Sequence, residues 1–164
     1  MAVRLLDQNA QPFALDGLRG QTVVLNFIFT HCPSVCPTQT RALTRVQAQL
    51  PTQVRERVQF VSVSIDPERD TPAVMADFSR KLGVDLSHWS FVTGTQAAIA
   101  ELNQAYSAQA LPEGASAFDH RSEVRLIGPS GKLLMTYVGR PLDEPRLARE
   151  IQTVDRMFRR TASR

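Results

Sequence analysis

The sequence of 164 residues lacks the features that mark several large classes of protein. No apolar run approaches the roughly 18 to 20 residues that span a bilayer, so the chain as it stands is expected to be soluble. Two cysteines are too few to indicate the redox compartment by their number. Neither sign of charge dominates, since 19 Lys and Arg stand against 16 Asp and Glu.

The basic residues are spread along the chain apart from an arginine-rich end, residues 156–164. That end has no interleaved aromatic residues, so we interpret it as a solvated tail and expect no nucleic-acid partner. The first 15 residues lack the apolar core of a signal peptide. The chain is therefore either cytoplasmic or begins at a methionine that replaced a leader or an anchor. Its length predicts one domain, residues 1–164.

Hydrophobic periodicity predicts alternating strands and helices. Strands are expected at residues 22–29, 61–65, 89–92, 123–127 and 133–138. Helices are expected after Pro37, Thr71, Thr95 and Asp143, and the apolar face of the last one is Leu147, Ile151, Val154 and Phe158. This order predicts an α/β fold with a thioredoxin-like central mixed sheet flanked by helices, an inserted β-α unit and a C-terminal β-hairpin plus helix.

Both cysteines lie in the stretch FTHCPSVCPTQT, and each is followed by a proline. A residue before proline is disfavoured in the α region, so we predict that neither Cys32 nor Cys36 lies inside a helix and that a helix begins at Pro37. Cys36 is then the N-cap, where the helix dipole lowers the pKa of its thiol, and Gln39 can close a capping box. A turn that starts at Pro33 lets the two sulfurs converge, either on each other or on a metal.

Three histidines are available as a further ligand. His31 adjoins Cys32 and is expected to have a structural or supporting role, and His88 is expected at the surface. His120 ends a long loop before the hairpin, and in a thioredoxin-like sheet that loop end faces the start of the thiol-bearing helix. Two thiolates and one imidazole form a soft site suited to Cu(I), whereas Zn²⁺ would require a fourth ligand.

The chain resembles the Sco/SenC family of copper-binding cytochrome c oxidase assembly proteins. The matching stretches are NFIFTHCPSVCP, VSIDPERDTP, FVTGT and FDHRSEVRLIGPSGKLL, which follow one another over nearly the whole chain. The resemblance implies a domain that binds copper through Cys32, Cys36 and His120, with Cu(I) as the expected form and Cu(II) left open by the sequence. It implies a periplasmic domain held by an N-terminal membrane anchor that this chain lacks, or one in the mitochondrial intermembrane space.

The family resemblance also implies partners and supporting residues. The expected partners are a copper-receiving protein such as a cytochrome c oxidase subunit, and a copper donor or thiol reductant. Contact with a membrane is expected only through the anchor. Asp66 and Asp70 follow a predicted strand near the site, and turn formation and helix capping explain them better than direct ligation. We expect them to support the site from outside its ligand set.

Three functions fit the thiol motif to different degrees. The leading hypothesis is a copper metallochaperone, in which oxidation of the two thiols to a disulfide removes two ligands at once. The alternative is a thiol-disulfide oxidoreductase with Cys32 and Cys36 as its redox-active catalytic pair, although CxxC is the usual spacing there. A peroxiredoxin-like peroxidase is disfavoured, because no threonine stands three residues before either cysteine.

Overall fold

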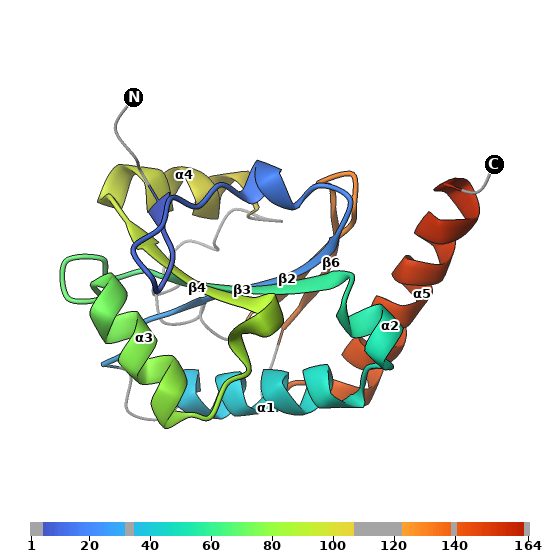
Figure 1. The fold of residues 1–164 in the computed structure, drawn as a ribbon, viewed down its shortest axis with the longest axis horizontal. Coiled ribbons are helices and arrows are strands. Elements are labelled where there is room, and N and C mark those ends of the chain that lie inside the picture. Colours follow the sequence, from blue (N-terminus) through green and yellow to red (C-terminus); the bar gives the residue numbers. More distant parts are fainter. Residues whose placement is uncertain (1–4, 32–34, 107–122, 139–140, 163–164) are drawn as a thin grey trace.

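The computed structural model describes residues 5–31, 35–106, 123–138 and 141–162 (Figure 1). Cys32 and His120 lie outside the described residues, and of Cys36 only the backbone is described. In this part of the chain one sheet has six strands, which in spatial order are β1 (Leu5–Leu6), β4 (Trp89–Gly94), β3 (Val58–Ser64), β2 (Thr22–Ile28), β5 (Val124–Ile127) and β6 (Leu133–Tyr137).

The three middle strands run parallel, and the three outer strands run antiparallel to their neighbours. Parallel neighbours need a crossover connection. The connection from β2 to β3 contains α1 (Val35–Gln49) and α2 (Thr52–Arg55), and that from β3 to β4 contains α3 (Pro72–Lys81). β2 is buried along its whole length, as its nearly continuous apolar sequence predicts for a central strand.

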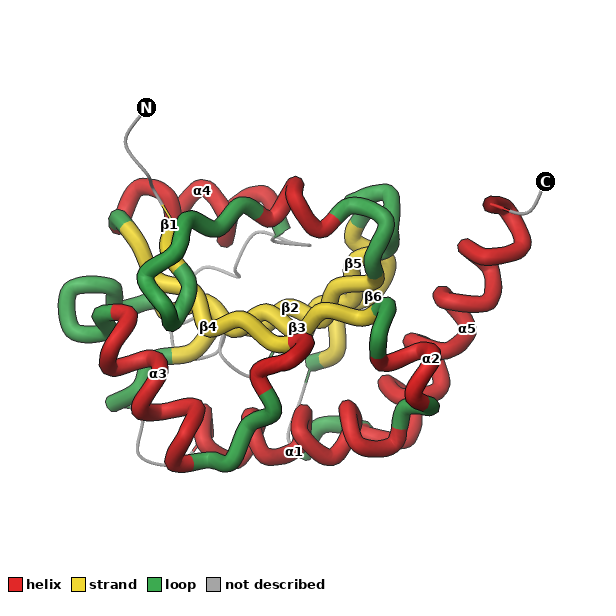
Figure 2. Tube along the Cα trace, in the orientation of Figure 1, coloured by secondary structure: helices red, strands yellow, loops and turns green. Residues whose placement is uncertain are grey.

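Helices cover both faces of the sheet (Figure 2). On one face lie α1, α3 and α5 (Glu144–Ala162), and on the other lies α4 (Gln96–Ala105). Two short 3₁₀ turns, Leu15–Leu18 and Leu86–His88, complete the described elements. The larger core fills the space between the sheet and the first group of helices, and its members include Phe60, Trp89, Phe91, Leu43, Val46, Met75, Leu147 and Ile151. None of the described helices has the length and apolar character needed to cross a membrane.

The helix starts that the sequence predicts by side-chain capping are confirmed. Thr71 accepts a hydrogen bond from the backbone N–H of Val74 at 3.3 Å, with Pro72 at the first position of α3. Thr95 caps α4 in the same way, and Asp143 accepts from the N–H of Arg146 at 3.2 Å before α5. Each cap satisfies a donor that the first turn of a helix leaves without a partner.

The predicted start of the thiol-bearing helix is wrong. α1 begins at Val35 rather than at Pro37, so Cys36 lies inside the first turn and is not the N-cap. The physical reason is that the first four N–H groups of a helix have no partner within it, so Pro37 at the third position breaks no hydrogen bond. The restriction on the residue before proline is a preference that the helix start overrides.

Phe158 was predicted to lie on the buried face of the last helix, and the structure exposes it. Its side chain is 40% exposed, and Met157 beside it is 63% exposed. The last turns of α5 extend past the sheet (Figure 1), so the described part of the chain covers the continuation of the apolar stripe only in part. The arginine-rich end, predicted to be a solvated tail, is helical as far as Ala162.

Two segments cover the outer edge of β4, the strand β1 and the side chain of Gln8. The short strand β1 pairs Leu5 with Gly94 and Leu6 with Thr93. Further along the edge, the backbone N–H of Phe91 donates to the side-chain Oε1 of Gln8 at 3.0 Å. Gln8 is buried, and its carboxamide stands where a neighbouring strand would place a carbonyl group.

Candidate metal centre

The chain delivers the thiol motif to the edge of the sheet where the parallel strands β2 and β3 end. The two strands are paired from Thr22 with Val58 to Ile28 with Ser64, and the N–H of Ile65 donates to the carbonyl of Ile28 at 2.8 Å. The segment that leads to Cys32 therefore lies beside the segment that leads to Asp66. This is the neighbourhood that the sequence predicts for the cysteines and the two aspartates.

Asp70 fixes the segment directly before Cys32. Its carboxylate is fully buried and accepts from the Thr30 N–H at 3.2 Å and from the Thr30 hydroxyl at 2.5 Å. It also accepts from the hydroxyl of Ser64 at 2.7 Å. A buried carboxylate is costly unless it is well bonded, and these three donors supply that compensation.

Asp66 is bound to the same cluster through a different set of contacts. Its backbone N–H donates to the Ser64 hydroxyl at 3.0 Å, and its carbonyl accepts from the N–H of Asp70 at 2.9 Å. Its carboxylate forms an ion pair with Arg69, with 2.7 Å between Oδ2 and Nε. Both aspartates thus form a turn against the end of β3, and their role in supporting the site from outside its ligand set stays a prediction.

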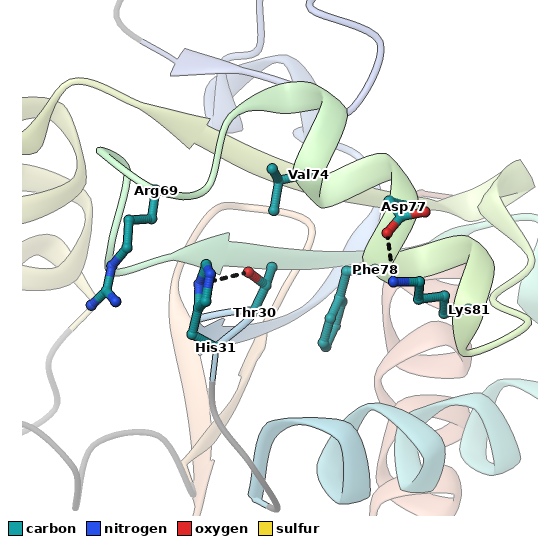
Figure 3. A pocket seen from close by; sticks show the side chains of 7 residues that line it. All are labelled: Thr30, His31, Arg69, Val74, Asp77, Phe78 and Lys81. Atoms are coloured by element: carbon teal, nitrogen blue, oxygen red, sulfur yellow. Dashed lines mark hydrogen bonds and ion pairs between the residues drawn. The ribbon is translucent and has the colours of Figure 1, made fainter.

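His31 lies at the surface beside this cluster. Its side chain is 51% exposed, with Nδ1 3.8 Å from Asp70 Oδ1. The same nitrogen is 3.3 Å from the Thr30 hydroxyl (Figure 3). These contacts agree with a structural or supporting role for His31.

A pocket of about 470 Å³ opens between this segment and α3. Figure 3 shows Thr30 and His31 on one side and Val74, Phe78 and Lys81 of α3 on the other. Arg69 and Asp77 complete its lining. A hydrogen bond from Lys81 at 2.9 Å lowers the pKa of Asp77 below its ordinary value, so this carboxylate stays ionised and paired. The pocket is therefore an open, mixed polar and apolar surface next to the thiol motif.

A row of buried polar groups lies under the first turns of α1. The side-chain Nδ2 of Asn26 in β2 donates to Gln39 Oε1 in α1 at 2.9 Å, and Asn26 Oδ1 accepts from the Ser62 hydroxyl at 2.6 Å. The indole N–H of Trp89 donates to the same hydroxyl oxygen at 3.0 Å. Gln39 therefore bonds to the sheet through its Oε1, in place of the capping box that its position predicts.

Two of the predicted ligands belong to residues outside the described set, so the group of Cys32, Cys36 and His120 stays a prediction. Among the described residues, no three His, Cys, Asp or Glu side chains are grouped to hold a metal ion. His88 lies at the start of β4, and parallel strands begin at the opposite edge of the sheet from the end of β2. It is therefore too far away to join the cysteines.

Sequence reasoning did not find Thr30, Ser64 or Asn26, although the structure places all three at this edge or directly beneath it. The signal for Asn26 was present, since it is a carboxamide inside the apolar strand TVVLNFIF. The signals for Thr30 and Ser64 were weak, because hydroxyl groups are common near strand ends. Their shared partner Asp70 lies 40 residues after Thr30, although only six after Ser64.

The fold by itself assigns the chain to a broad structural class. A mixed sheet with a helix that begins within the thiol motif, followed by a C-terminal hairpin and helix, is a thioredoxin-like α/β arrangement. The family model for SCO1/SenC matches residues 2–155. The chain belongs to the SCO1/SenC family, as its sequence motifs predict.

Relatives and solved structures agree with this membership. A "Putative copper-binding protein" of Stutzerimonas stutzeri is 34% identical over 135 residues, which are 80% of this chain and 65% of that protein. The mouse "Protein SCO2 homolog, mitochondrial" is 32% identical over 154 residues, which are 90% of this chain and 59% of that protein. The match thus spans less than two thirds of each of these relatives.

Among solved structures, BsSco is described as a member of the Sco family of cytochrome c oxidase assembly proteins with a disulfide switch. It matches with a TM-score of 0.76 and 28% identity over 92% of this chain and 90% of that chain. Bradyrhizobium japonicum ScoI with copper bound matches with a TM-score of 0.69 and 26% identity over 93% of this chain and 96% of that chain. These structures confirm the predicted fold class.

Proposed function

We propose that this chain is a copper metallochaperone that binds Cu(I) through Cys32, Cys36 and His120 and delivers it during assembly of the copper centre of cytochrome c oxidase. Membership of the family supports this proposal, as does the bound copper in the Bradyrhizobium protein. Thiolates and imidazole suit Cu(I) because both are soft or borderline donors.

The register of β5 on β2 is the observation that carries the proposal. Val124 pairs with Asn26 in antiparallel fashion, so the chain before Val124 continues along the direction in which β2 leads toward Cys32. His120 stands three residues before Glu123, a stretch of chain that reaches at most about 11 Å. This short reach supports the proposal that His120 joins the two cysteines at the end of the sheet where β2 leads toward Cys32.

The chemistry proposed for this site is a ligand exchange that the thiol pair controls. Two thiolates and one imidazole would hold Cu(I), and a receiving protein would replace these ligands one by one. Oxidation of Cys32 and Cys36 to a disulfide, with loss of two electrons to a disulfide partner, would remove two ligands together and prevent binding. We propose that Cu(II) is held by the same three groups.

We further propose a periplasmic location with an N-terminal membrane anchor, or the mitochondrial intermembrane space as the alternative. The partners would be a copper-receiving cytochrome c oxidase subunit and a copper donor or thiol reductant. The names of BsSco and of the mouse relative support these assignments.

A thiol-disulfide oxidoreductase is the second candidate function. The observation in its favour is that Cys36 lies in the first turn of α1, near the positive end of the helix dipole. This position favours the thiolate, which is the reactive form in disulfide exchange. In that case, the chain would reduce the cysteines of a copper-receiving partner, and His120 would contribute little.

A copper competition experiment separates the two functions. The protein is reduced without oxygen and titrated with Cu(I) against a coloured Cu(I) chelator, together with Cys36→Ser, His120→Ala and the matched control His88→Ala. The metallochaperone site predicts one tightly held copper per chain, abolished in Cys36→Ser, weakened at least about tenfold in His120→Ala and unchanged in His88→Ala.

The opposite pattern would reject the three-ligand site. If the native chain does not compete for copper, or if His120→Ala competes equally well, thiol-disulfide exchange becomes the better function. A parallel assay of disulfide reduction in an oxidised dithiol substrate would then retain its rate in His120→Ala and lose it in Cys36→Ser.

A further inference from the structure

We infer that Asn26 is a positioning residue for the copper site, acting through Gln39 on the first turn of α1. The inference rests on the proposed function, since it assigns a role to residues outside the ligand set. Gln39 lies three residues after Cys36, and residues at this spacing lie close together on the same side of a helix. A contact that fixes Gln39 therefore fixes the turn that carries one of the thiols.

The two ends of α1 rest on the sheet through different kinds of contact. From Leu43 onward, the buried side chains include Leu43 and Val46, which belong to the apolar core together with Leu50 directly after the helix. In the first two turns, the buried side chains among those described are the polar Gln39 and Thr40 and the small Ala42. Apolar packing is not directional, whereas a hydrogen bond fixes both distance and orientation. The thiol end of the helix is thus held by a contact that specifies its position.

Asn26, which donates the hydrogen bond to Gln39, is itself fixed by the strands on both sides of it. Asn26 is 1% exposed and lies in a central strand, paired through its backbone with Ser62 on one side and Val124 on the other. Its Oδ1 accepts from the Ser62 hydroxyl, and Ser62 accepts from the indole of Trp89. This assigns the orientation of the Asn26 amide, because the oxygen is engaged by a donor and the nitrogen must point toward Gln39.

The row from Trp89 to Gln39 therefore links β4, two strands away on the same face of the sheet, to the thiol-bearing helix. Hydrogen bonds in such a chain polarise and strengthen one another in a buried setting. Without the donor at Asn26, Gln39 Oε1 would be left buried without that bond, and the first turn of α1 would shift so that the oxygen could reach water. A shift of that turn would move the thiol of Cys36 relative to the other two ligands.

Substitutions on both sides of the Asn26–Gln39 contact test this role. Asn26→Leu removes both polar atoms, and Gln39→Met removes the acceptor at nearly constant size. Gln39→Glu keeps an acceptor for Asn26 and serves as the conservative rescue. Gln59→Leu is the control, because it removes a comparable bond, Gln59 Nε2 to Ser90 Oγ at 3.1 Å, between β3 and β4 and away from α1.

Two measurements report on the position of the thiols. The first is Cu(I) affinity in the chelator competition. The second is the equilibrium of the Cys32–Cys36 pair with glutathione, in which protein dithiol and glutathione disulfide form protein disulfide and two glutathione thiols. We expect Asn26→Leu and Gln39→Met each to weaken copper binding at least about tenfold and to shift the glutathione equilibrium measurably. Gln39→Glu should remain within about threefold of the native chain in both.

Thermal unfolding distinguishes positioning from a loss of stability. Gln59→Leu should lower the melting temperature without a change in copper affinity or in the glutathione equilibrium. The inference is overturned if Gln39→Met folds and binds copper like the native chain, or if the affinity lost in each variant simply follows its melting temperature.

The glutathione measurement also separates this inference from the proposed function. A native chain that does not bind copper would refute the metallochaperone, and the thiol equilibrium would still test Asn26. If the native chain binds copper and Gln39→Met changes neither measurement, the positioning role fails while the metallochaperone stands.

Discussion

Thr30 and Asp70 lie 40 residues apart in the chain, and Thr30 donates two hydrogen bonds to the buried carboxylate of Asp70. The backbone N–H and the hydroxyl of Thr30 each reach a different oxygen of Asp70. This pair ties the end of β2 to the loop after β3, directly before the first cysteine. The position of the thiol motif therefore depends on a residue that is not itself a proposed ligand.

Replacement of Asp70 by asparagine should affect both stability and copper binding. The side-chain NH₂ of the asparagine would face one of the three groups that now donate to the Asp70 carboxylate. We therefore expect the free energy of unfolding to fall by about 2 to 3 kcal/mol. Cu(I) affinity should fall about tenfold, because Thr30 would lose its fixed position. Urea unfolding and chelator competition would measure the two effects. The control Asp77→Asn removes a surface ion pair with Lys81 and should cost less than about 1 kcal/mol.

Asp155 should make stability depend on pH in the acid range. It is 4% exposed and is joined to Arg57 by two hydrogen bonds, of 2.8 and 2.9 Å. These bonds lower the pKa of Asp155 in the folded protein, and Arg159 contributes to the same shift. A lowered folded pKa gives a contribution that is complete above the unfolded value of about 3.9 and is lost as the pH falls toward the folded pKa.

Urea unfolding of native protein and Asp155→Asn at several pH values would measure this dependence. At pH 7 the variant should be about 2 kcal/mol less stable, and the difference should shrink below about pH 4. The exposed Asp16→Asn should show no comparable difference at any pH. A difference for Asp155→Asn that stays constant from pH 7 to pH 3 would contradict the assignment.

Arg125 should be replaceable by methionine at little cost. Its side chain is fully buried over the ring of Phe27 and forms an ion pair with Glu123, and burial lowers the pKa of Arg125 below its ordinary value. Within the described part of the chain, its Nε and Nη1 have no hydrogen-bond partner.

A buried ion pair with incomplete bonding is often no better than an apolar side chain of similar size. We expect Arg125→Met to leave the free energy of unfolding unchanged or to raise it by about 1 kcal/mol. Arg125→Ala should lower it by at least about 2 kcal/mol, because it leaves a cavity. A loss of more than about 2 kcal/mol in the methionine variant would show that the charge itself is needed.

The two halves of α5 should respond differently to truncation of an apolar side chain. Ile151 is fully buried in the larger core, whereas Phe158 is 40% exposed beyond the sheet. Ile151→Ala should cost about 2 to 5 kcal/mol, and Phe158→Ala less than about 1 kcal/mol. Chemical unfolding of the two variants gives the comparison directly, and equal losses would mean that the end of α5 is covered.

Local signals account for most of the fold that could be predicted. Thr71 followed by Pro72 specifies a helix start within a few residues, and the apolar run of β2 specifies a central strand without knowledge of its neighbours. The start of α1 was mispredicted because a preference of the residue before proline competes with a first turn that tolerates proline. The strand β1 was missed because two residues carry no period, and only pairing with β4 defines them.

In the candidate site, too, local sequence indicates some residues, whereas only the tertiary structure shows their contacts. The cysteines, His120 and the aspartates are indicated by residue type and spacing, and the family membership of the chain is confirmed. The tertiary contacts around these residues could not be predicted, since Gln39 in α1 bonds to Asn26 in β2 and Thr30 bonds to Asp70 with α1, α2 and β3 between them in the chain. A local pattern at Gln39 suggested a capping box, and the tertiary contact overrides it.

The hydrogen bond that Gln8 accepts at the edge of β4 affects which surfaces of this protein can bind other proteins. An open sheet edge offers N–H groups to any extended chain, and added strands lead to aggregation. By accepting from the N–H of Phe91, Gln8 occupies a donor that a foreign strand would need, and β1 occupies the next stretch of the same edge. Encounters with other proteins are thereby discouraged along β4 and left to other parts of the surface, among them the end of the sheet that leads to the cysteines.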